Sequence, residues 1–314
     1  MADNDGQWER GLIEKLATEA LKEQRRARRW GIFWKVLTFS YITVVIVLAM
    51  DWKGGGDSKG GGHTALVEIN GIIGPGTDAS AEKVSTALQG AFKDKNTRGV
   101  VLRINSPGGS PVQSQSIYDE MKRLRVKYPA IPLYVVVEDL CASGGYYVAA
   151  AADRIYVAKG SIVGSIGVRM DNFGVVGLME KLGVERRLIT AGKNKALLDP
   201  FLPLEESHKQ IAIGLIGEIH EQFIAAVREG RGKRLKETPD MFSGLIWSGA
   251  KSVELGLADA YGSLDYVARE VIKAEEIVDY TQKENLAEKV ARRFGAGAMG
   301  SLLESATRSG LAIH

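Results

Sequence analysis

Two hydrophobicity patterns divide this chain. Residues 30–50, WGIFWKVLTFSYITVVIVLAM, form a nearly continuous apolar run in which Lys35 is the only charge. From residue 65 onward, short apolar runs alternate with longer amphipathic stretches. The first pattern is typical of a membrane-spanning helix, and the second is typical of strands that alternate with helices.

The apolar run has the features of an uncleaved membrane anchor. At about 1.5 Å per residue it spans a hydrocarbon core of roughly 30 Å. Trp30, Trp34 and Trp52 lie at its edges, and no small-residue cleavage site follows it. A buried core helix would not explain the tryptophans at both edges of the run. Nor would it explain the arginine cluster on one side only, which consists of Arg25, Arg26, Arg28 and Arg29. We therefore predict a cytoplasmic segment at 1–29, an anchor at 30–52 and the rest of the chain outside, in the periplasm of a bacterium.

The rest of the chain divides into a linker, a domain and a tail. Residues 53–63 are glycine-rich and predict a flexible linker, whereas 283–314 form a basic tail. Residues 64–282 predict one α/β domain with a mostly parallel sheet covered on both faces. Its expected strands are 65–73, 99–104, 132–138, 154–158 and 184–190, and its expected helices are 79–95, 111–127 and 204–229.

Composition narrows the function classes. The 314 residues carry a net charge of only +3, and no basic patch is interleaved with aromatic residues, which argues against nucleic-acid binding. The single Cys141 excludes an intrachain disulfide. The four histidines are scattered without ligand spacing, so we expect neither a metal nor a cofactor.

Two short loops carry candidate chemistry. Ser143 stands between the apolar run 132–138 and a stretch of small residues, where a strand-to-helix turn would project its hydroxyl and present free N–H groups. The loop NSPGGS, residues 105–110, follows the preceding strand. Because ligands bind at the carboxyl ends of parallel strands, the two loops could face each other. Taken alone, the Ser143 stretch favours an ordinary turn, and the NSPGGS loop is equally consistent with one.

A serine nucleophile needs a base, and no histidine lies in these loops. A lysine can serve if burial lowers its pKa enough to keep it neutral. Lys195 precedes Ala-Leu-Leu, which would give it apolar cover, whereas Lys193 has glycine and asparagine neighbours. Spacing favours Lys195 only modestly. Ser165, in the charge-poor loop 160–168, could hold the amine in place.

The ordered motifs NSPGG, ASGGYYVA, GSIGV and AGKNKALLDPF, together with residues 246–265, resemble signal peptide peptidase A in its short, single-domain form. This resemblance implies a Clp-protease/crotonase-like fold built as a spiral of β-β-α units. It implies Ser143 as nucleophile, Lys195 as general base and Ser165 as the residue that orients the lysine. It also implies an oxyanion hole from the N–H groups of Gly108 and Gly144.

The same resemblance implies a serine endopeptidase on the inner membrane that degrades cleaved signal peptides and other unfolded apolar peptides. It further implies a homo-oligomer in which the serine of one subunit meets the lysine of its neighbour. Two rival functions remain open: a crotonase-fold enzyme acting on a coenzyme A thioester, and a non-catalytic membrane scaffold. A stomatin-associated serine–lysine peptidase is a near variant, for which further membrane spans would be expected.

Overall fold

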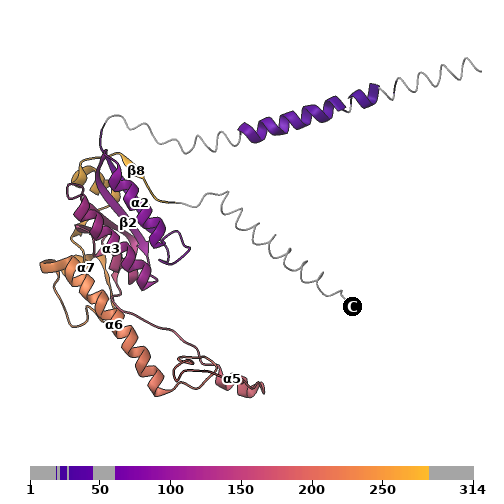
Figure 1. The fold of residues 1–314 in the computed structure, drawn as a ribbon. Helices are drawn as coiled ribbons and strands as arrows, with labels where there is room; N and C mark the ends of the chain where they lie inside the picture. The colour runs from indigo at the N-terminus through magenta and orange to yellow at the C-terminus, as the bar shows by residue number, and fades with distance from the viewer. Residues whose placement is uncertain (1–18, 20–21, 27, 45–60, 283–314) are drawn as a thin grey trace, which may run out of the picture. The chain divides into compact units, whose positions relative to one another are not determined.

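The computed structural model describes residues 19, 22–26, 28–44 and 61–282 (Figure 1). The chain divides into two units, residues 1–59 and 60–314. In the first unit, residues 28–44 are helical and expose apolar side chains such as Trp34 and Phe39. No helix within the described residues is both long enough and apolar enough to cross a membrane. Residues 45–52 of the predicted anchor lie outside the described part, so the anchor stays a prediction.

The second unit is built on a mostly parallel sheet, which confirms the predicted α/β class. Its described part has eight strands, with the main order β6-β5-β3-β2-β1-β8, while β4 pairs with β3 and β7. Every pairing is parallel except that of β5 with β6. The strands are β1 (His63–Asn70), β2 (Thr97–Ser106), β3 (Leu133–Ala142), β4 (Arg154–Val157), β5 (Ile162–Gly164), β6 (Ile246–Ser248), β7 (Ala260–Tyr261) and β8 (Ile277–Asp279).

Helices cover both faces of the sheet. On one face, α2 (Ala81–Lys93), α3 (Pro111–Lys127) and α4 (Gly144–Ala149) enclose the main core, which includes Phe92, Met121 and Tyr146. On the other face, a smaller cluster forms where Val267 packs against Val101 and Val136. Val267 lies in the helical segment formed by α8 (Leu264–Tyr266) and the π-helical turn η2 (Val267–Ile272). Of the remaining helices, α5 (Val176–Lys181) and α7 (Gly249–Glu254) are short.

The longest helix of the described chain, α6 (Glu206–Arg231), leaves the domain (Figure 1). Its C-terminal half is anchored by buried side chains, among them Phe223 and Val227. Its N-terminal half exposes Ile211, Ile213 and Leu215. Residues 168–205, which we call the arm, include α5 and lie at the outer end of this helix (Figure 1).

Most predicted elements are present, and one is wrong. The predicted helix 111–127 coincides with α3, where the Ser110 side chain accepts from the Gln113 N–H and Pro111 occupies the first turn. The predicted strand 184–190 has no regular structure and is exposed throughout. Its apolar residues could not form a strand here because they lie in the arm, away from the sheet.

Candidate active site

Ser143 lies at the turn that joins β3 to α4. Its backbone is in an unusual conformation, with φ 51° and ψ −125°. Two hydrogen bonds hold it there: the Ser143 N–H donates to the Gly164 carbonyl at 2.8 Å, and its carbonyl accepts from the Tyr147 N–H at 3.0 Å. A non-glycine residue at positive φ costs on the order of 1–3 kcal/mol and is found preferentially at active sites. The side chain is half-buried, so it is held in place yet reachable.

The glycine loop, residues 105–110, lies directly against this turn, as predicted. Gly108 has φ 97°, and a Cβ placed on it would lie 2.8 Å from the Cβ of Ser143 and 2.6 Å from the N atom of Gly144. On the side away from Ser143, Gly109 pairs with Ile73 in an isolated parallel β-bridge. Only glycine at position 108 lets the loop approach the serine turn this closely.

The hydrogen bonds of the glycine loop bear on the expected oxyanion donors, Gly108 and Gly144. The N–H of Gly108 already donates to the Ser106 Oγ at 3.1 Å. The bridge to Ile73 uses the Gly108 carbonyl and the Ser110 N–H, which leaves the N–H of Gly109 outside it. The Gly109 N atom lies only 3.2 Å from where a Cβ on Gly144 would be. The N–H of Gly108 is thus engaged, whereas the N–H groups of Gly109 and Gly144 are the remaining candidate donors near Ser143.

No feature of the sequence distinguishes Gly109 from Gly108 as a donor. Both glycines follow Pro107, and either could adopt a positive φ. The choice depends on the hydroxyl of Ser106, whose position only the folded loop defines.

Ser165 lies beside Ser143 in the same chain. Strands β3 and β5 pair in parallel with Ala142 opposite Gly164, so Ser143 and Ser165 are the next residues on the two neighbouring strands. Ser165 also has a positive φ, 52°, and its N–H donates to the Leu245 carbonyl at 2.7 Å. Two half-buried hydroxyl-bearing residues thus follow adjacent strand ends.

Lys195 does not join this group within one chain. It is exposed in a turn of the arm, where its N–H donates to the Gly192 carbonyl at 3.1 Å. The arm lies at the outer end of α6 (Figure 1), whereas the Ser143 turn leads into α4, whose end packs against Gly230 near the other end of α6. The single chain therefore brings together Ser143, Ser165 and the glycine loop, but not the predicted base.

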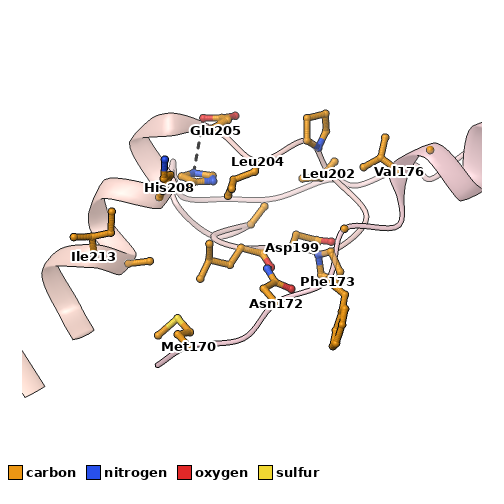
Figure 2. Close-up of a pocket in the computed structure, with 18 of the residues that line it drawn as sticks. Met170, Asn172, Phe173, Val176, Asp199, Leu202, Leu204, Glu205, His208 and Ile213 are labelled. Atoms are coloured by element: carbon orange, nitrogen blue, oxygen red, sulfur yellow. Dashed lines mark hydrogen bonds and ion pairs between the residues drawn. The ribbon is translucent and has the colours of Figure 1, made fainter. Parts of the chain in front are cut away.

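A pocket of about 520 Å³ opens in the arm next to this turn (Figure 2). Its wall is mostly apolar and combines the arm loops with the first half of α6. His208 is largely buried there, with its Nε2 3.9 Å from Glu205 Oε2. The apolar lining includes Met170, Phe173, Val176, Leu202, Leu204 and Ile213, which suits an apolar side chain.

Comparisons with known proteins agree with this geometry. The sequence model of Peptidase family S49 matches residues 126–278, and that of Clp protease matches residues 67–159. The chain is 34% identical over 267 residues to "Putative protease MJ0651" of Methanocaldococcus jannaschii, covering 80% of this chain and 85% of that protein. It is 33% identical over 197 residues to "Putative signal peptide peptidase SppA" of Enterococcus faecium, covering 62% of this chain and 56% of that protein.

A further match is to a protein of Brucella abortus named "Na(+)/H(+) antiporter NhaA", with 44% identity over 204 residues. It covers 63% of this chain but only 28% of that protein, so the chain spans little more than a quarter of this relative. By contrast, the S49 match runs from the end of α3 to β8 and contains the whole turn around Ser143. Together with a putative protease aligned along most of its length, this makes the chain a member of peptidase family S49, with similarity to a protein named signal peptide peptidase SppA.

Proposed function

We propose that the chain is a serine endopeptidase that works with a Ser/Lys dyad, Ser143 as nucleophile and Lys195 as general base. The observation that carries the proposal is the strained Ser143 at a strand end, facing the N–H groups of Gly109 and Gly144. Ser165 lies alongside, where it can accept a hydrogen bond from the lysine amine.

In this mechanism, neutral Lys195 takes the proton from Ser143 Oγ as the oxygen attacks a peptide carbonyl carbon. The carbonyl oxygen becomes an oxyanion, which accepts hydrogen bonds from Gly109 and Gly144. Each such donor contributes about 3–4 kcal/mol to the transition state. The lysine then gives its proton to the leaving amine, and an acyl-enzyme on Ser143 remains. Lys195 next takes a proton from a water molecule as the water oxygen attacks the ester carbon. The ester C–O bond then breaks, and Lys195 gives that proton to the departing Ser143 Oγ.

We propose that the lysine comes from a neighbouring copy. The outer half of α6 and the arm expose apolar side chains that a partner would cover, among them Leu178, Leu182, Val184, Ile189 and Leu215. Lys195 itself lies on this arm, so the surface that needs a partner also carries the base.

Complementation tests the shared dyad. Ser143→Ala and Lys195→Ala should each be inactive on an unfolded apolar peptide. Mixed in equal amounts and reassembled, they should regain about one quarter of the wild-type activity, since one site in four combines an intact serine with an intact lysine in a closed ring. Unmixed variants, taken through the same treatment, are the control. Full activity of Lys195→Ala would refute Lys195 as base, and no recovery on mixing would refute sharing between copies.

For substrates we propose cleaved signal peptides and other unfolded, apolar segments. The apolar pocket next to Lys195 supports this preference, as does the likeness to a putative signal peptide peptidase. Cleavage should be fast for an apolar peptide and absent for the same segment inside a stably folded protein. Equal rates on the two forms would contradict the proposal.

We also propose residues 30–52 as a membrane anchor that places the domain in the periplasm, with 1–29 in the cytoplasm. The apolar run, its tryptophan edges and the arginine cluster at 25–29 support this. The full chain should stay in the membrane pellet after alkaline extraction, and protease added to spheroplasts should digest the domain. A chain released by alkaline extraction would contradict the anchor.

A further inference from the structure

Ser106 links the glycine loop to the rest of the site. It is the last residue of β2 and is fully buried. Its Oγ donates to the carbonyl of Gly71 at 2.6 Å and accepts from the N–H of Gly108 at 3.1 Å. One hydroxyl thus joins the loop after β1 to the loop after β2.

These two hydrogen bonds determine which amide of the glycine loop is available. The Gly108 N–H is held by Ser106, and the Gly108 carbonyl is held by the Ile73 N–H at 2.9 Å. With both polar groups of Gly108 fixed, the following peptide plane is fixed too, and it carries the N–H of Gly109. A trans peptide directs its N–H opposite to its carbonyl, so this N–H points away from Ile73, and the Gly109 N atom lies 3.2 Å from where a Cβ on Gly144 would be.

We infer that Ser106 is the positioning residue of the oxyanion hole: by engaging Gly108, its hydroxyl assigns the oxyanion to the N–H of Gly109. The inference rests on the proposed function, because it concerns the same site. Without the hydroxyl, the buried Gly108 N–H lacks an acceptor and the loop turns to find one, which moves the Gly109 N–H out of line.

The test compares three serine variants. Ser106→Ala should lower kcat about 10- to 100-fold while KM changes less than about threefold, because the hydroxyl acts on the transition state. Affinity for a peptide boronic acid, whose adduct on Ser143 mimics the tetrahedral intermediate, should fall by the same factor. Ser106→Thr keeps the hydroxyl and should keep most of kcat. Ser252→Ala is the matched control: Ser252 is fully buried and donates to the Gly249 carbonyl at 2.8 Å in α7.

The outcomes separate this inference from the proposed function. Wild-type kcat and boronic acid affinity in Ser106→Ala would overturn the positioning role. So would an equal loss of kcat in Ser252→Ala, because the effect would then be general to a lost buried hydroxyl. A Ser143→Ala variant that retains activity would instead overturn the proposed nucleophile, whatever Ser106 does.

Discussion

Replacing Gly108 with alanine tests how closely the glycine loop must approach the nucleophile turn. The new methyl group would lie 2.6 Å from the N atom of Gly144, 2.8 Å from the carbonyl oxygen of Ala142 and 2.8 Å from the Cβ of Ser143. These neighbours are backbone atoms and a Cβ, which no side-chain rotation can move. The loop and the turn must therefore separate.

Two costs add at this position. Alanine at φ 97° costs about 1–2 kcal/mol of backbone strain, and the overpacked contact costs about 1–3 kcal/mol more. Gly76→Ala provides a matched control, because Gly76 has φ 75° but a Cβ there meets nothing within 4 Å. We expect a loss of about 2–5 kcal/mol in the free energy of unfolding for Gly108→Ala, and about 1–2 kcal/mol for Gly76→Ala.

Activity should separate the two variants further. A displacement of about 1 Å between nucleophile and oxyanion donors can lower kcat/KM about 100-fold. We expect that loss for Gly108→Ala and less than a twofold change for Gly76→Ala, with urea unfolding and cleavage of an apolar peptide as the assays. If the two variants lost equal stability and kept equal activity, the close approach would have no importance and the reasoning would be refuted.

Other predictions concern the core and its charges. Asp259→Asn should cost about 3 kcal/mol, since it leaves the buried Arg231 guanidinium, 2.8 Å from Asp259 Oδ1, without its charge partner. Burial alone would raise the pKa of Asp259, but the hydrogen bond and the charge of Arg231 hold that pKa below its usual value. The carboxylate therefore adds stability that is present above about pH 4 and is lost as the pH falls through its folded pKa. The urea midpoints of wild type and Asp259→Asn should accordingly converge in acid. Phe92→Ala should cost about 3–5 kcal/mol, because Phe92 is fully buried between α2 and the sheet; a loss below 1 kcal/mol in urea would contradict this packing. Tyr146→Phe should cost about 1–2 kcal/mol by removing the buried hydroxyl's bond to the Leu257 carbonyl, and unchanged urea unfolding would contradict that estimate.

The sequence predicted the elements whose signals are local. The Ser110–Pro111 pair defines the start of α3, and the β-branched run 132–138 defines β3. The serine turn was predictable because a strand signal and a helix of small residues leave only the residues between them for the turn. The meeting of two such turns followed from the rule that parallel strands share one carboxyl edge.

What the sequence could not predict depends on tertiary contacts. Strands β5 and β6 have three residues each, too few for a periodic pattern to show. Residues 184–190 have strand composition, yet they lie in the arm, where the described chain offers no strand to pair with. The engagement of Gly108 by Ser106 is likewise invisible in a motif that contains two adjacent glycines.

The separation of Lys195 from Ser143 follows from the construction of α6. The first buried residue of this helix is Phe223, so about 17 residues, or roughly 25 Å, extend outward before the arm begins. The buried C-terminal half fixes the helix direction, and bending it back would break consecutive backbone hydrogen bonds. A lysine at the outer end is therefore badly placed for its own serine and well placed for a serine outside its own domain. Under the proposed shared Ser/Lys dyad, one neighbouring copy would account for both features: it would cover the exposed apolar arm and supply the serine that meets Lys195.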